Sequence, residues 1–245
     1  MNRPEAVFGA DGRLFLRHGP IELIVEMFGA EAEVARAYDQ ARQYADGLLE
    51  ELVKELTLLR RPLGAAYPMF HGAVAKAMAR AAWPHRGVHI TPMAAVAGAV
   101  ADGVLAAAVA GCELEKGYVN NGGDIAFHLA PGAWLEAGVV ADLGHGGLSG
   151  KARLRHDMAI RGIATSGWRG RSQSLGIADA VTVLASTAAQ ADAAATMIAN
   201  RVDIDYPGIE RVPANSLDPD SDLGTLAVTV AVPELSEGAK RSALL

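Results

Sequence analysis

The longest apolar stretch of the sequence, residues 93–112, limits what the chain can fold into more than any other feature. At about 20 residues it is long enough to cross a bilayer as a helix. It is rich in alanine, however, and it contains three glycines and a carboxylate, Asp102. Alanine adds little to membrane insertion, and an aspartate at mid-span is costly. We therefore expect a buried core helix, whose small side chains would let another backbone, a ligand or a second copy of the chain approach closely.

Charge and cysteine content restrict the partners and the compartment. The 245 residues carry a formal net charge of -6, and the arginines form only short clusters, such as Arg60-Arg61. Proteins that bind nucleic acid or anionic lipid concentrate basic residues in patches, so we expect neither partner. The single cysteine, Cys112, excludes an internal disulfide. No apolar signal core follows the first residues, and we expect a cytoplasmic protein.

The spacing of apolar residues predicts one α+β domain over residues 1–245. Helical spacing covers residues 31–59, 69–82, 93–112 and 188–200, with Thr91-Pro92 opening the third helix and Ser186 or Thr187 capping the fourth. Short strand-like runs occupy residues 14–17, 21–28, 118–120, 125–129, 134–140, 152–155, 159–164, 180–185 and 225–232. Because helices and strands do not alternate regularly, this order favours a layered antiparallel or mixed sheet packed with helices. We expect a loop at residues 203–222 and frayed ends near 1–12 and 234–245.

The first candidate for a binding site is the turn Asn120-Asn121-Gly122-Gly123-Asp124-Ile125, which lies between two predicted strands. Two adjacent glycines permit positive φ and let a ligand approach the backbone. The exposed N–H groups of such a turn can form an anion-binding concavity. An Asn-Gly pair between strands is also a strong hairpin signal. The motif therefore predicts either a ligand-binding turn or an ordinary hairpin.

Asp192 and Thr196 form the second candidate. Residues four apart on a helix share one face, so this carboxylate and this hydroxyl can present two hard oxygens to one cation. Magnesium prefers few carboxylates, with water and ligand phosphate completing its shell. The alternative is an exposed aspartate and a threonine that bonds back to its own helix.

The third candidate is Thr165-Ser166-Gly167, where a predicted strand runs into two hydroxyl residues and a glycine. Such a turn can bind a phosphate or the edge of a flavin, or it can cap itself. His145 lies in a glycine-rich loop that could close over a site. The sequence places no serine or carboxylate to form a catalytic triad with this histidine.

Together these motifs resemble the ApbE superfamily. The shared pattern comprises Thr-Pro-Met-Ala-Ala-Val-Ala-Gly-Ala-Val-Ala at 91–101, Asn-Gly-Gly-Asp-Ile at 121–125, Ala-Thr-Ser-Gly at 164–167 and Ala-Asp-Ala-Ala-Ala-Thr at 191–196. The best-known members are magnesium-dependent FAD:protein FMN transferases, which move FMN from FAD onto a threonine of a target protein. The chain looks most similar to an ApbE-like branch of this superfamily, over most of residues 14–203.

The resemblance implies a magnesium site beside a flavin-nucleotide site. Asp192 and Thr196 match the side-chain ligands of the metal, and Ala97 matches an alanine whose carbonyl also faces it. The residues that match the two ligand-binding turns of the family are Asn121, Gly122, Gly123 and Asp124 in one turn and Thr165, Ser166 and Gly167 in the other.

Residues 168–179 depart from the family pattern. The transferases carry a His-x-Ile-Asp-Pro-x-Thr-Gly segment here, whereas this sequence opens with Trp168-Arg169-Gly170-Arg171 and ends at Asp179. The lysine that follows the matching alanine in the transferases is absent as well. Arg169 and Arg171 could bind a different anionic ligand, because guanidinium groups pair well with phosphate and carboxylate, or they could lie in a solvated loop.

Three hypotheses follow from these features. The leading one is a protein that binds an anionic or phosphorylated ligand, such as the flavin nucleotides FAD or FMN, together with magnesium; as an FMN transferase it would act on a protein substrate. The second is a non-catalytic binding or carrier protein that keeps the fold. The third is an enzyme of a different reaction that uses Arg169, Arg171 and Asp179 in the same groove.

Overall fold

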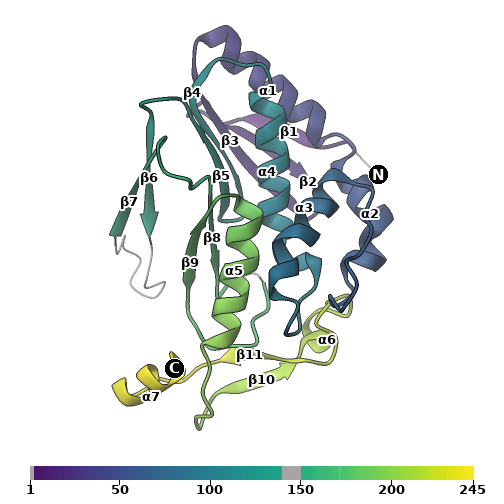
Figure 1. The fold of residues 1–245 in the computed structure, drawn as a ribbon, viewed down its shortest axis with the longest axis vertical. Helices are drawn as coiled ribbons and strands as arrows, with labels where there is room; N and C mark the ends of the chain where they lie inside the picture. The colour runs from purple at the N-terminus through teal and green to yellow at the C-terminus, as the bar shows by residue number, and fades with distance from the viewer. Residues whose placement is uncertain (1–2, 140–149, 171) are drawn as a thin grey trace.

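A seven-stranded antiparallel sheet with helices on one face organises the protein (Figure 1). The computed structural model describes residues 3–139, 150–170 and 172–245. His145 and Arg171 lie outside these ranges, so neither prediction is addressed by the structure. The mixture of antiparallel strands and packed helices confirms the predicted α+β class.

The strands of the main sheet follow the order β1-β2-β3-β4-β5-β8-β9. Their bounds are β1 Glu5–Phe8, β2 Leu14–His18, β3 Ile21–Gly29, β4 Leu114–Asn121, β5 Asp124–Leu129, β8 Gly162–Ser166 and β9 Val181–Ala185. Consecutive strands are neighbours except where β6 (Trp134–Val139) and β7 (Gly150–Arg155) leave the sheet between β5 and β8 as a separate hairpin. This excursion places β8 directly beside β5.

Five helices lie on one face of this sheet, and some of them contact it only through the other helices. They are α1 Glu31–Ala45, α2 Leu48–Leu59, α3 Ala73–Ala82, α4 Val96–Val109 and α5 Ala188–Arg201. The prediction of one continuous helix over residues 31–59 is wrong. The chain breaks at Gly47, whose φ of 92° is left-handed, a conformation that glycine adopts without steric cost. The 3-10 turns Trp83–His85 and Pro92–Ala95 connect α3 to α4.

Helix α4 is the centre of the apolar core. Val100 and Val104 are completely buried, and the helix packs against α1, α3 and α5 and against strands β4 and β5. Among the described residues, Pro92–Val109 is the one helical stretch long and apolar enough to cross a membrane, and half of it is buried inside the fold. Core packing, one of the uses expected for this stretch, accounts for its composition.

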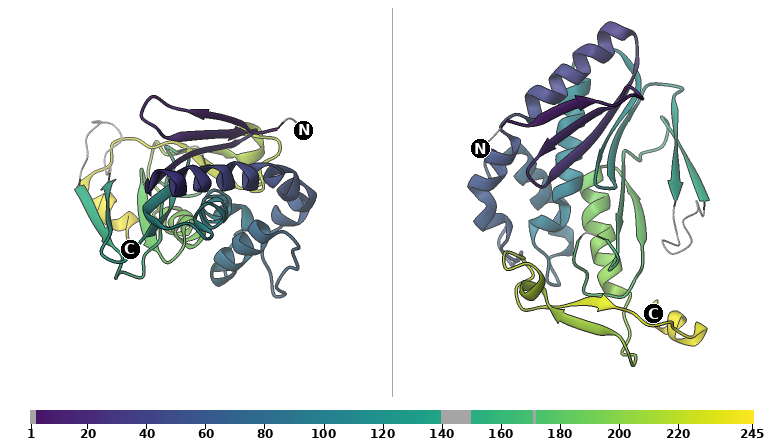
Figure 2. Two further views of the ribbon diagram at one scale, coloured as in Figure 1. Left: turned by 90° about the horizontal axis from the view of Figure 1, so that it is seen from above. Right: turned by 180° about the vertical axis from the view of Figure 1, so that it is seen from behind.

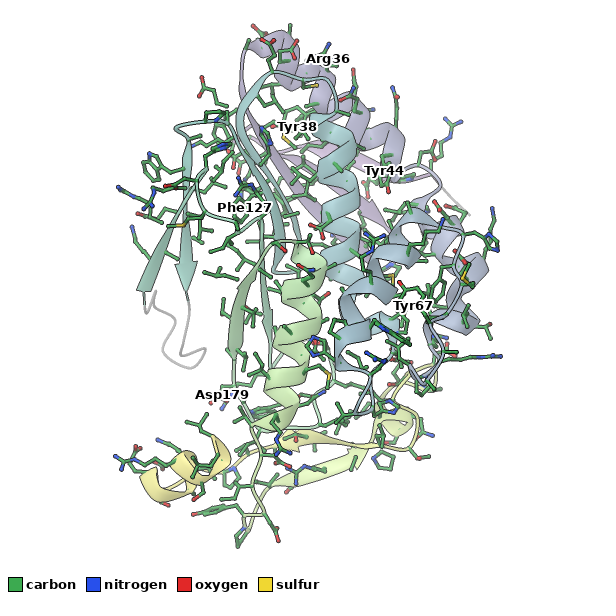
Figure 3. All side chains as sticks on the ribbon, in the orientation of Figure 1. Arg36, Tyr38, Tyr44, Tyr67, Phe127 and Asp179 are labelled. Carbon is green, nitrogen blue, oxygen red and sulfur yellow. The ribbon has the colours of Figure 1, made fainter. Side chains whose placement is uncertain are left out.

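The opposite face of the sheet is only partly covered. The β6–β7 hairpin stands over strands β5 and β8, whereas β1, β2 and β3 have no layer above them (Figure 2). Phe127 of β5 points toward the hairpin side of the sheet (Figure 3). The molecule therefore has two different surfaces on which a ligand could lie, one at the helices and one beneath the hairpin.

The last 40 or so residues form a separate layer below the sheet (Figure 1). It consists of β10 (Glu210–Pro213), α6 (Ala214–Leu217), β11 (Ala227–Ala231) and α7 (Glu237–Ala243), with β10 and β11 antiparallel. We expected residues 203–222 to be loop, but they contain β10 and α6. Strand β1 and helix α7 occupy the two ends for which we expected fraying.

Candidate functional site

The site begins with an unusually close approach of helices α4 and α5. A Cβ atom added to Gly98 of α4 would lie 2.3 Å from the carbonyl oxygen of Ala188, the first residue of α5. A Cβ atom on Gly162 of β8 would lie 2.1 Å from the backbone nitrogen of the same alanine. The start of α5 is therefore clamped between α4 and the sheet, at positions where only glycine fits.

Asp102 of α4 completes this clamp. Its two carboxylate oxygens accept hydrogen bonds from the backbone nitrogens of Ala188 and Ala189, each at 2.9 Å. Thr187 adds a side-chain cap by accepting from the backbone nitrogen of Gln190 at 3.1 Å. Helix N-termini carry unsatisfied N–H groups and a partial positive charge, so these contacts fix where α5 starts and therefore where Asp192 and Thr196 lie.

A cavity of about 700 Å³ opens beside α5 and between the sheet and the β10–β11 layer. Asp192 and Thr196 both line it, as expected for residues on one helix face. The other predicted site residues that line this cavity are Ala97, Asp124, Thr165 and Ser166. The structure thus brings together residues from α4, β5, β8 and α5 that are far apart in the sequence.

The Asp192 carboxyl has a strongly raised pKa. Its Oδ2 accepts a hydrogen bond from the backbone nitrogen of Gly98 at 3.0 Å. Burial raises the pKa of this carboxyl well above its usual value, and the negative charge of Asp124 raises it further, while the backbone N–H groups of Ala97 and Gly98 oppose the shift. A desolvated carboxylate close to a second acid favours the binding of a proton or a cation.

The glycine turn is a hairpin, and its glycines do not line this cavity. Asn121 and Asp124 pair across β4 and β5, Gly122 and Gly123 have φ values of 65° and 114°, and the backbone nitrogen of Gly123 donates to Asn120 Oδ1 at 2.8 Å. The hairpin interpretation therefore describes Gly122 and Gly123. The residues flanking them reach the site, because Asn121 is buried and donates to the carbonyl oxygen of Ala97 at 3.1 Å.

The Thr165-Ser166-Gly167 segment ends strand β8 at the edge of the cavity. The backbone nitrogen of Thr165 donates to Asp124 Oδ1 at 3.3 Å, and its hydroxyl lies 2.9 Å from that of Thr182. Ser166 is buried and lines the cavity. A Cβ atom on Gly167 would lie 2.3 Å from the carbonyl oxygen of Asp179, so this glycine is required by chain packing rather than by a ligand.

Arg169 does not point an unpaired charge into the cavity. Its Nε donates to Asp179 Oδ1 at 2.6 Å, its guanidinium stacks over the ring of Trp168, and the same carboxylate accepts from Trp168 Nε1 at 3.1 Å. Figure 3 shows Asp179 at the lower end of β9. This arrangement corresponds to the solvated loop that was the alternative to anion binding for Arg169, and the pairing with Asp179 was not predicted.

The lower end of the cavity contains residues that the motifs did not identify. Asp218, Asp220 and Asp222 line it, Asp222 accepts a hydrogen bond from the hydroxyl of Thr91, and Asp220 lies 3.9 Å from Arg60. The alternating aspartates of Asp218-Pro219-Asp220-Ser221-Asp222 were the sequence signal, but nothing indicated that this loop returns to α4. The cavity therefore has a strongly acidic lining.

The donors at the upper end suit a small, hard cation. They comprise the carboxylates of Asp124 and Asp192, the hydroxyl of Thr196 and the carbonyl oxygen of Ala97. Within the described ranges, no group of three or more His, Cys, Asp and Glu side chains is arranged to hold a metal by itself. Magnesium is compatible with such a site, because it keeps several waters and uses ligand phosphates in addition to one or two carboxylates.

Comparison with known proteins identifies archaeal relatives over part of the chain. A UPF0280 protein of Methanosphaerula palustris is 44% identical over 148 residues, which are 58% of this chain and 57% of the relative. UPF0280 proteins of Methanopyrus kandleri and Methanoculleus marisnigri are 40% and 42% identical, over 55% and 63% of this chain and 51% and 60% of their own lengths. The chain thus spans a little over half of the length of these relatives. The model of one family, described as AbpE bacteria, matches residues 5–245, and the chain belongs to that family.

Proposed function

We propose that this protein binds an anionic or phosphorylated ligand, of which a flavin nucleotide is the leading example, together with magnesium in the cavity beside α5. The observation that carries the proposal is the position of the Asp192 carboxylate. It is partly buried, close enough to Asp124 for the negative charge of that residue to raise its pKa, and one helical turn from the Thr196 hydroxyl. A partly buried carboxylate with a raised pKa close to a second acid is stabilised by a bound proton or cation, and together with the Thr196 hydroxyl this supports a metal site.

The acidic character of the described lining favours an anionic ligand that binds together with a cation. The described lining residues include five aspartates and one arginine, Arg60, and this excess of carboxylates disfavours a phosphate that enters without a cation. When bound, magnesium would neutralise ligand phosphates and stabilise a phosphate leaving group. The protein's own residues would hold the ligand in place: Asp192, Asp124, Thr196 and Ala97 at the metal, and Ser166 and Thr165 beside it.

The transfer chemistry implied by the resemblance to the ApbE superfamily would require a threonine-bearing protein as acceptor. We keep a non-catalytic binding or carrier protein as the second candidate. The observation that favours it is the Trp168–Asp179 segment, in which Arg169 is occupied by Asp179 instead of facing the cavity. Both candidates place the protein in the cytoplasm and use the same cavity.

Thermal shift and calorimetric titration test the proposal with three probes: ADP, FAD and FMN, each with and without magnesium chloride. The wild-type protein should be stabilised by at least one probe only when magnesium is present, and Asp192→Asn should abolish that effect. Asp39→Asn is the matched control, because Asp39 is an exposed carboxylate on α1 (68% exposed) remote from the cavity.

The outcomes separate the candidate functions. If no probe stabilises the wild type, the nucleotide proposal is wrong. If Asp192→Asn is still stabilised by a probe and magnesium as the wild type is, Asp192 is not a ligand of the metal. If FAD binds, incubation with a threonine-bearing target followed by mass spectrometry distinguishes transfer, which adds the mass of the FMN group to the target, from binding alone.

A further inference from the structure

A second cavity, of about 540 Å³, lies on the other face of the main sheet, beneath the β6–β7 hairpin. Its floor is the sheet itself. Ile125, Ile163 and Leu184 form one row across strands β5, β8 and β9, because the three residues are paired in register. Phe127 and Tyr118 are paired across β5 and β4 and extend this floor with two aromatic rings.

The hairpin forms the roof of this cavity, and the size of its side chains explains why the space beneath it is not filled. Two cross-strand pairs of the hairpin line it, Leu135 with Leu154 and Ala137 with Ala152. Leu154 is buried and packs with Phe127 and Ile163, so the leucine pair joins the hairpin to the sheet. Ala137 also packs against this cluster, but the alanine side chains are short, and a space remains over the apolar row. Leu184, at its mouth, is 39% exposed.

The polar groups of the cavity are few, and two of them form a pair at one edge. Thr165 and Thr182 are paired in β8 and β9, and their hydroxyl oxygens are 2.9 Å apart. A bond between two hydroxyls uses only one of their two hydrogens, so the pair can still donate to a ligand. Asn120 lines the same cavity. The only charged lining residue among those described is Glu136, which pairs with Lys151 at 2.6 Å.

We infer that this cavity is a second binding site, for an uncharged, flat, aromatic ring with polar atoms on one edge. Small-molecule sites combine an apolar lining with a few directed polar groups in volumes of roughly 300–1,000 Å³, and this cavity has that character. The near absence of charge separates it from the acidic cavity beside α5. Thr165 lines both cavities, so β8 is the wall between the two sites. The inference does not depend on a metal or on the proposed function.

A fluorescence titration with phenylnaphthylamine tests this site. The probe is an uncharged aromatic amine whose emission rises in apolar surroundings. It should bind the wild-type protein saturably, at one site. Two substitutions fill the cavity from opposite walls, Ala152→Phe from the hairpin and Leu184→Trp from the sheet. Each should weaken binding by about tenfold or more, because the added ring occupies the space of the ligand.

The control is Val53→Phe, which adds the same kind of ring to the surface of helix α2, where Val53 is 40% exposed and outside this cavity. It should leave the affinity unchanged. Leu184→Trp changes a partly exposed position, so it keeps the test valid if Ala152→Phe fails to fold, as checked by circular dichroism. Absence of saturable binding, or equal binding by the wild type and Leu184→Trp, would overturn the inference.

Discussion

Replacing Gly98 by alanine tests how the fold positions the candidate site. The added Cβ atom would lie 2.3 Å from the carbonyl oxygen of Ala188, whereas ordinary contact begins at 3.4 Å. Helices α4 and α5 must therefore separate by about 1.1 Å, the difference between these two distances. The bonds from Ala188 and Ala189 to Asp102, now 2.9 Å long, would then exceed hydrogen-bonding distance.

The expected cost follows from these contacts. Overpacking a tight contact costs about 1–3 kcal/mol, and loss of the two hydrogen bonds adds about 1 kcal/mol each. The higher helix propensity of alanine increases the unfolding free energy by about 1 kcal/mol, because glycine is a poor helix former. The net loss of unfolding free energy is about 2–4 kcal/mol, which corresponds to a fall in melting temperature of about 4–16 °C for a chain of this size.

Thermal and urea unfolding measure this loss, with Gly103→Ala as the matched control in the same helix. A Cβ atom on Gly103 would meet the hydroxyl end of Tyr44 at 2.8 Å and Cγ2 of Val74 at 3.2 Å, and these side-chain atoms can shift more easily than the backbone atoms that block Gly98. The control should therefore change stability by less than about 1 kcal/mol. Equal stability of Gly98→Ala and Gly103→Ala would refute the idea that Gly98 clamps α5.

Three further predictions follow from the site. Burial and Asp124 raise the pKa of Asp192 above its unfolded value of about 3.9, so the folded state binds this proton more tightly. Without divalent cation, stability should therefore fall as pH rises from about 4 through the raised pKa; urea unfolding in EDTA should show that Asp192→Asn removes this part of the fall. Thr187→Ala should cost about 1 kcal/mol of unfolding free energy in the same assay, because α5 loses its side-chain cap, and an unchanged midpoint would contradict the capping role. Asp179→Ala should barely change stability, since exposed ion pairs contribute little, but it should strengthen binding of ADP by releasing Arg169; unchanged or weaker binding in calorimetry would show that Arg169 has no access to the ligand.

Local chemistry made much of the secondary structure predictable. Thr91 caps the turn that leads into α4, accepting from the backbone nitrogen of Met93 at 3.1 Å, and Thr187 caps α5, as the sequence indicated. The break between α1 and α2 was not predictable from periodicity, because Gly47 leaves the apolar spacing of both helices in phase. Strand β1 pairs with the neighbouring strand β2, whereas the loop around Asp220 is held by Arg60 and Thr91, which are distant in the sequence.

The candidate site was predictable in parts and not as a whole. The spacing of Asp192 and Thr196 places them on one helix face without knowledge of the fold. That Asp124 faces Asp192 depends on the pairing of β5 with β8 and on the packing of α5 upon them. The pairing of Arg169 with Asp179 likewise depends on the path of the intervening loop. Non-local contacts of this kind leave no periodic signal in a single sequence.

A divalent cation bound at Asp192 is the central feature of the proposed site, and the binding of Mn²⁺ in place of magnesium tests it directly. Electron paramagnetic resonance titration with manganese chloride counts bound ions, because free and bound Mn²⁺ give different signal intensities. The wild-type protein and Asp39→Asn should bind one ion with the same affinity, and Asp192→Asn should bind it at least about tenfold more weakly. Binding of manganese that Asp192→Asn leaves unchanged would contradict the account.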